Sequence, residues 1–251
     1  MGCGASFPAA DGFLVEHPAS ARGLMLGDLA STAAGPVTLR YSAGITIGTP
    51  CGMEPTSNPV KDSSGNVLFT VCRAGEPPGN SDFNFGQWRK LIRQPTIVRD
   101  AAGKCIAMLK SDSIKDPVQP GNVYTVYSAK PPFEGQAAAF TVEDVALYAA
   151  FKVQNLANRT YRVIMVKDAS GGLEQQPAYT LKSYMTFSPV DKFVLTLPEH
   201  TTKEPMGVAC GDKNGSADYL LTVSKGMDAG LAVMAGFAMA LLNDEIPGSS
   251  K

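Results

Sequence analysis

Residues 229–242 read AGLAVMAGFAMALL, a stretch of fourteen residues without a charge. Asp228 stands directly before it and is a good N-cap, and Asn243 follows and can end a helix. Counted from Asp228 at about 1.5 Å per residue, such a helix is about 22 Å long, whereas a membrane span needs about 20 apolar residues. The stretch therefore predicts one short helix that is apolar on every face and must be buried completely.

The composition of this helix favours burial in protein over burial in lipid. Gly230, Gly236 and many alanines make it thin, which suits the close approach of surrounding strands. Asp244 and Glu245 follow at once, without the basic flank or aromatic belt of a membrane span. We expect the helix to form the core, where each of its larger side chains contributes about 1.5–3 kcal/mol on burial. Entry of the helix into a bilayer is the alternative.

The rest of the chain predicts strands. Short β-branched runs separated by turn residues are typical of antiparallel sheet closed into a barrel or sandwich. Asp100 to Lys104 looks like a hairpin turn between two of them. A barrel of about eight strands is filled by its own side chains, so enclosing a helix requires more, about a dozen. The expected fold is therefore mainly β, a closed antiparallel β-barrel of about twelve strands around a central hydrophobic C-terminal helix. The expected strands are 67–71, 95–99, 105–109, 123–127, 145–153, 161–166, 178–187, 192–197, 208–210 and 219–223.

Bulk composition limits the classes of function. A chain of 251 residues with 44% hydrophobic content can form one sizeable core. Lys and Arg number 22 against 23 Asp and Glu, so the net charge of -1 gives no long-range attraction to nucleic acid or anionic lipid. The five cysteines are scattered and lack metal-ligand spacing, which favours reduced cytosolic thiols and no metal or cofactor. Residues 1–12 lack the basic start and apolar core of a secretory signal.

The N-terminus indicates where the protein is held. Met1-Gly2-Cys3-Gly4-Ala5-Ser6 fits the myristoylation pattern, with Gly2 as the acceptor after removal of Met1. One myristoyl chain binds membranes only marginally, and Cys3 is a candidate palmitate acceptor that supplies the second signal. We expect an acylated flexible tether over 1–35, a barrel domain over 36–246 and a disordered tail over 247–251. This organisation predicts a lipid-anchored peripheral protein at the cytosolic face of a membrane.

The C-terminal segment resembles a known family. A strand followed by Lys225-Gly226-Met227-Asp228-Ala229, an apolar helix and Asn243 to Ile246 is similar to the ending of the LURP-one-related family. This family lies in the tubby C-terminal-like superfamily, which also holds the phospholipid scramblases. Segments 64–69 and 100–106 show weaker similarity, and the whole resemblance spans about 37–246.

The resemblance implies a twelve-stranded barrel around a central helix and no enzymatic activity. Tubby domains bind phosphoinositides, and scramblases are membrane-linked, calcium-responsive and palmitoylated near the N-terminus. The sequence departs from the family pattern at Lys225-Gly226, where the proline of the glycine-proline turn is missing. The scramblase cysteine cluster is also missing, apart from Cys3.

The best candidate for phospholipid headgroup binding is a basic segment around the only tryptophan. Its cations can meet phosphate, with the indole at the membrane interface. An edge strand protected by charge is the alternative interpretation. The candidate residues are Trp88, Arg89, Lys90, Arg93 and Arg99.

Three other features have weaker functional interpretations. Asp212 to Asp218 places oxygen side chains at alternate positions like a calcium loop, but Asn214-Gly215 is also a preferred hairpin turn. Lys130 to Gln136 is either a partner-binding loop or a stiff connector. Cys210 with His200 is the one pair that would suit a small hydrolase.

The sequence therefore predicts a non-enzymatic membrane-tethered scaffold or lipid-sensing module. A scramblase-like lipid transporter, with the helix in the bilayer, is the first alternative, and a cysteine hydrolase is the second. The expected partners are the membrane surface, anionic headgroups and a protein, and no nucleic acid.

Overall fold

A computed structural model describes residues 14–16, 25, 32–42, 58–73, 95–112, 123–140, 143–155, 158–184, 192–211 and 218–244. Its elements in chain order are β1 Val37–Ser42, β2 Asn58–Lys61, β3 Val67–Arg73, β4 Thr96–Arg99, β5 Cys105–Asp112, β6 Val123–Ser128, β7 Ala146–Asn155, β8 Thr160–Met165, β9 Tyr179–Tyr184, β10 Lys192–Thr196, β11 Gly207–Gly211, β12 Asp218–Val223 and the helix α2 Ala229–Asp244. The predicted tail over 247–251 lies outside the described residues.

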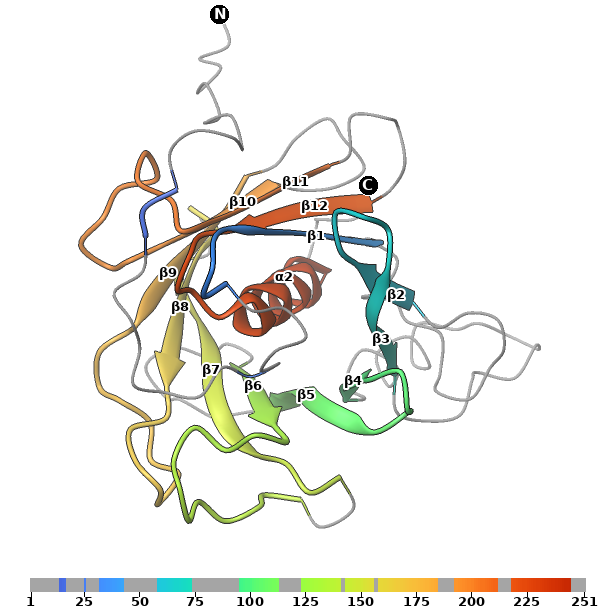
Figure 1. Ribbon diagram of the computed structural model, residues 1–251. Helices are drawn as coiled ribbons and strands as arrows, with labels where there is room; N and C mark the ends of the chain where they lie inside the picture. The colour runs from blue at the N-terminus through green and yellow to red at the C-terminus, as the bar shows by residue number, and fades with distance from the viewer. Residues whose placement is uncertain are drawn as a thin grey trace, which may run out of the picture.

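The twelve strands form a closed antiparallel barrel. Each strand pairs with its neighbours in chain order, and β1 closes the barrel by pairing with β12, with Val37 opposite Val223 and Tyr41 opposite Tyr219. Figure 1 looks into the barrel and shows α2 inside the ring of strands. The predicted fold, a closed barrel of about twelve strands around a C-terminal helix, is confirmed.

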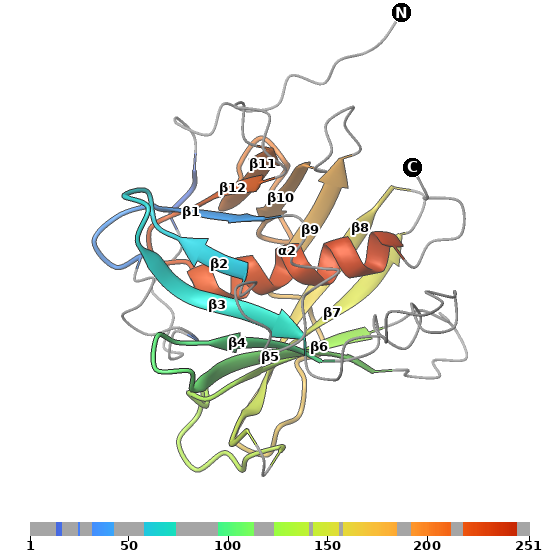
Figure 2. The same cartoon turned by 90° about the vertical axis from the view of Figure 1, so that its right-hand side faces the viewer.

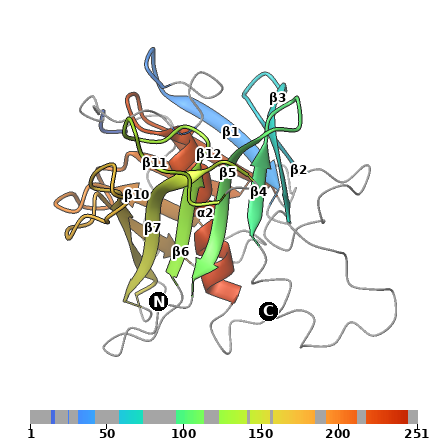
Figure 3. The same ribbon diagram turned by 90° about the horizontal axis from the view of Figure 1, so that it is seen from below.

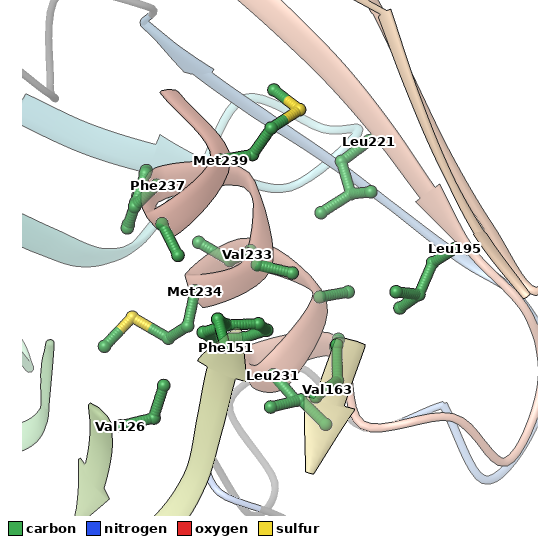
Figure 4. Close-up of a cluster of buried hydrophobic side chains, with 14 of the residues drawn as sticks. Val126, Phe151, Val163, Leu195, Leu221, Leu231, Val233, Met234, Phe237 and Met239 are labelled. Atoms are coloured by element: carbon green, nitrogen blue, oxygen red, sulfur yellow. The ribbon is translucent and has the colours of Figure 1, made fainter. Parts of the chain in front are cut away.

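The core lies between α2 and the inner face of the barrel. Every side chain from Ala229 to Met239 that the structure describes is at most 2% exposed. Figure 2 shows α2 crossing the barrel lengthwise, and Figure 3 shows it behind β5 and β6. In Figure 4 its larger residues lie among side chains from surrounding strands. Those labelled are Val126 of β6, Phe151 of β7, Val163 of β8, Leu195 of β10 and Leu221 of β12.

This placement decides between the two interpretations of the apolar helix. Strands surround α2, so the helix that was predicted to need complete burial is buried inside the protein. Among the described residues, no helix combines the length and apolar character needed to cross a membrane.

A glycine allows α2 to pack closely against β1 and β10. A Cβ atom at Gly236 would lie 3.1 Å from the Phe193 ring and would overlap the hydroxyl oxygen of Tyr41. Tyr41 stacks on Tyr219 with ring centroids 5.2 Å apart and meets Phe237 edge-on at 5.3 Å. Only glycine therefore fits at this point of the helix without movement of the surrounding rings.

Asp228 caps the helix and connects three parts of the chain. Its Oδ1 accepts a hydrogen bond from the backbone N–H of Leu231 at 3.1 Å, as an N-cap does. Its Oδ2 accepts bonds from the backbone N–H of Met25 at 2.9 Å and from the Tyr148 hydroxyl. Burial raises the pKa of Asp228 above its ordinary value, and these hydrogen bonds oppose the shift.

Several residues of the segment expected to be a tether contact the barrel. Val15 N–H donates to the Pro205 carbonyl at 2.9 Å, and Glu16 forms an ion pair with Lys225 at 3.8 Å. Met25 is 1% exposed, and the hydroxyl of the fully buried Thr32 donates to the Met227 carbonyl at 2.6 Å. The described residues of segment 1–35 thus pack near the start of α2.

The strand predictions were accurate to within a few residues, with two omissions, β1 and β2. The hairpin from Asp100 to Lys104 forms, with a backbone hydrogen bond of 3.0 Å from Asp100 N to Lys104 O. The short strand β2 was not predicted. It has only four residues, among them Pro59, and a register shift between Val60 and Lys61. So short a run offers too little alternation to be recognised.

A second apolar cluster covers the outer face of β3 to β7. It contains Cys72, Ile97, Cys105, Met108, Tyr127 and Val145, and Ala129, Phe140 and Leu147 pack against it. Cys72 is disulfide-bonded, whereas Cys105 is free. The prediction that all the thiols are reduced is therefore wrong for Cys72. Disulfide formation depends on which Cα atoms the fold brings close together, and cysteine spacing alone does not reveal this.

Candidate functional site

The predicted headgroup-binding segment is described only at its last residue. Trp88, Arg89, Lys90 and Arg93 lie outside the described residues. Arg99 ends β4, where its Nη2 donates to Glu143 Oε1 at 3.1 Å and its Nη1 donates to the Gly103 carbonyl at 3.0 Å. The Arg99 side chain is 28% exposed and holds the 100–104 turn against Glu143. Its role in headgroup binding stays a prediction.

Cys105 lies beside this ion pair. Burial is the main cause that raises the pKa of the Cys105 thiol to about 12, and the negative charge of Glu143 is the next largest cause. The thiolate is the reactive form of cysteine, and at neutral pH almost none is present at such a pKa. Cys105 therefore acts as a small apolar residue of the outer cluster rather than as a nucleophile.

The strand register separates the two members of the predicted hydrolase pair. β10 and β11 form a hairpin in which Leu195 lies opposite Gly207, and His200 belongs to the connection beyond that end. Cys210 lies toward the other end of β11, about 10 Å along the strand from Gly207. The register thus places the two residues toward opposite ends of this hairpin. The fold thus offers no support for this pair as a catalytic site.

The remaining sequence candidates have different outcomes. The calcium candidate lies outside the described residues except for Asp218, and among the described residues no group of three or more His, Cys, Asp or Glu side chains is suited to hold a metal ion. In the 130–136 loop, Pro132 is buried and Gln136 Nε2 donates to the Leu147 carbonyl at 2.7 Å. This attachment to β7 fits the interpretation of the loop as a stiff connector. The acylation candidates Gly2 and Cys3 lie outside the described residues.

The structure reveals a feature that the sequence analysis missed, a row of cations on the outer face of β7 to β10. Lys152, Arg162, Lys182 and Lys192 each stand next to an inward-facing core residue of their own strand, so their side chains point outward. Arg162 is exposed and the three lysines are partly exposed. The four strands contain no Asp or Glu. We call these four residues the basic row.

The register places the basic row on a diagonal. Lys152 lies opposite Arg162, and Arg162 lies opposite Thr180. Lys182 is two residues farther along β9, and Lys192 pairs with Tyr184, two residues farther again. At about 4.8 Å between strands and about 3.4 Å per residue along them, the last two steps are about 8 Å each and the row is about 20 Å long.

Comparisons with known proteins add little to this description. No family model matches the chain, and no curated protein matches it. A protein from Arabidopsis thaliana with a solved X-ray structure aligns over 88% of this chain and 98% of its own, at 13% sequence identity and a TM-score of 0.46. A likeness of this size carries no conclusion about family or function. The described part of the chain defines the class as a closed twelve-stranded antiparallel barrel around a buried helix.

Proposed function

We propose that this chain is a non-enzymatic scaffold or lipid-sensing module held at the cytosolic face of a membrane by acyl chains on Gly2 and Cys3. The observation that carries the proposal is the N-terminal sequence Met1-Gly2-Cys3-Gly4-Ala5-Ser6. It joins a myristoylation pattern to an adjacent cysteine, and stable anchoring needs two such signals.

The barrel supports a scaffold role through its rigidity. α2 and the inward side chains fill its interior, so a partner meets the outer face and the connections between strands. The connection between β3 and β4 carries Trp88, Arg89, Lys90 and Arg93, which are the proposed headgroup contacts. A transporter in which α2 enters the bilayer would first have to expose this core.

We also propose that the chain belongs to the LURP-one-related family. The support is the C-terminal sequence from Lys225 to Ile246, together with the conformation that its first part adopts. Gly226 has a φ of 82°, a conformation that favours glycine, and its N–H donates to the Thr32 carbonyl at 3.2 Å. Asp228 then caps a helix inside a barrel, as the resemblance implies.

The anchoring proposal is tested by intact mass and membrane fractionation of the protein from a eukaryotic host. We expect the wild type to carry myristate and palmitate and to fractionate with membranes, and Gly2→Ala and Cys3→Ser each to become soluble. An unmodified, soluble wild type would contradict the anchor. Retention of both variants through carbonate extraction would instead indicate that the protein is integrated into the bilayer.

The headgroup contact is tested separately on unacylated protein with anionic liposomes. Arg89→Glu with Lys90→Glu is expected to weaken binding, because it replaces two attractive charges by two repulsive ones. Lys104→Glu with Lys130→Glu is the matched control, since both lysines are exposed and the change in net charge is equal. Equal binding by the two double variants would remove residues 88–93 from the proposal.

A further inference from the structure

We infer that the basic row is a docking surface for an extended acidic segment of a partner protein. The inference rests on the proposed scaffold role and names the chemistry of a partner for it. Lys152, Arg162 and Lys182 carry the argument, and Lys192 continues the row on the next strand.

Charge is the first reason. The whole chain is almost neutral, with 22 basic against 23 acidic residues, yet β7 to β10 carry cations and no acids. Lys152 and Arg162 lie directly opposite each other on adjacent strands, an arrangement that is destabilising by itself. Two ion pairs among the described residues, Arg99 with Glu143 and Lys225 with Glu16, lie away from the row. A ligand that brings negative charge would relieve this repulsion.

Geometry favours an extended polypeptide. Carboxylates at alternate residues of an extended chain are about 6.8 Å apart. The last two steps of the row are about 8 Å, which is about 1.5 Å longer, and the flexible side chains of lysine and arginine can bridge this difference. About seven extended residues match the whole row of about 20 Å. The hydroxyl of Thr180, opposite Arg162, and the ring of Tyr184, 5.2 Å from Lys182 Nζ, lie beside the same path.

A membrane fits the row less well than a peptide does. The row lies on the outside of a closed barrel, where the surface curves away from a flat bilayer. It also has no large exposed apolar side chain to insert, because the one such residue among those described is Val67 on β3.

The position of the row also separates it from the proposed membrane contact. In the ring of strands, β9 is six positions from β3 in either direction. Figure 1 accordingly shows β8 and β9 across the barrel from β3. The basic row and the two strands that the proposed headgroup segment joins therefore lie on opposite sides of the barrel wall.

The test is fluorescence anisotropy of the full unacylated chain with a labelled peptide of about seven residues that alternates Glu and Ser. The same peptide with Gln in place of Glu is the uncharged control. We expect the acidic peptide alone to bind, more weakly as salt is added. Lys152→Gln with Arg162→Gln should weaken binding by about fivefold to tenfold. Amide chemical shifts should change along 152–182 during the titration.

The matched control variant is Arg40→Gln with Lys61→Gln, an opposed pair of cations on β1 and β2 with the same change in net charge. It should bind the acidic peptide as the wild type does, and unchanged urea midpoints would show that both variants are folded. Equal loss in the two variants, or no binding by the wild type, would overturn the inference. The inference would also be overturned if the variant Lys152→Gln with Arg162→Gln lost its binding to anionic vesicles but kept its binding to the peptide. A protein that binds the peptide but carries no acyl chain would overturn the anchor alone.

Discussion

The contact between Gly236 and Tyr41 allows a sharp test of the packing around α2. Gly236→Ala gains about 1 kcal/mol of helix propensity, but its new methyl group would overlap the Tyr41 hydroxyl oxygen. Overpacking of this kind costs about 1–3 kcal/mol. We therefore expect a net loss of about 0–2 kcal/mol in the free energy of unfolding.

Removal of the hydroxyl should reverse this loss. The Tyr41 hydroxyl is buried and has no hydrogen-bond partner among the described residues, and burial raises its pKa well above the ordinary value. Because an unsatisfied buried polar group costs about 1–3 kcal/mol, Tyr41→Phe alone should stabilise the protein. In the double variant the nearest contact of the new methyl group becomes the Phe193 ring at 3.1 Å, which a small shift can relieve. We expect a favourable coupling energy of about 1–2 kcal/mol between the two substitutions.

Urea unfolding of the four proteins in this cycle measures the coupling, provided that the slope of the free energy against urea concentration stays constant. A stabilising Tyr41→Phe together with a Gly236→Ala whose cost disappears in the double variant would support the packing. Additive effects, or destabilisation by Tyr41→Phe, would refute the reasoning. Destabilisation by Tyr41→Phe would show that the Tyr41 hydroxyl has a favourable interaction in the folded protein.

Four further predictions concern the core and the cysteines. Burial raises the folded-state pKa of Asp228 above its ordinary 3.8, so the stability of the protein should fall as pH rises from 3.8 through the raised pKa. Urea midpoints measured against pH should show this fall in the wild type and a weaker fall in Asp228→Asn, which keeps an N-cap but does not titrate. Ala235→Asp should abolish folding by circular dichroism because it buries an unpaired charge, whereas Leu231→Ala should cost about 2–5 kcal/mol and still fold. Cys105, with its pKa of about 12, should react with iodoacetamide at pH of about 8 only after unfolding, and labelling of the native protein would contradict its burial. Cys72 is disulfide-bonded and should therefore resist alkylation in urea until reductant is added, and alkylation without reductant would contradict the bond. Because disulfides are rare in the cytosol, persistence of this bond in cells would count against the proposed location.

The fold was predictable wherever one local pattern was strong enough. Fourteen residues without a charge at 229–242 require a buried helix, and a buried helix requires a barrel larger than eight strands. β2 could not be predicted in the same way, because its four residues depend on pairing with β1 and β3. The partners of Asp228 were equally hidden, since Met25 and Tyr148 are distant in sequence and reach it only through closure of the barrel.

The candidate sites were harder to predict because they depend on register. Lys152, Arg162, Lys182 and Lys192 stand on four strands, and each alone is an ordinary outward residue of a sheet. A shift of one residue in any pairing would turn the affected side chains inward, so their alignment is a property of the barrel. Register also separates His200 from Cys210, which the sequence had suggested as a pair.

The contacts of the N-terminal segment set the reach of the proposed anchor. A free tether from Gly2 to residue 35 would extend at most about 120 Å, at about 3.6 Å per residue. The hydrogen bond from Val15 to Pro205 and the bond from Met25 to Asp228 fix the chain to the barrel much earlier. The stretch before Leu14 then spans at most about 43 Å, which is about the diameter of a small domain plus a headgroup layer. Acyl chains on Gly2 and Cys3 would therefore hold the barrel close to the bilayer, tied at the end of the barrel where α2 begins.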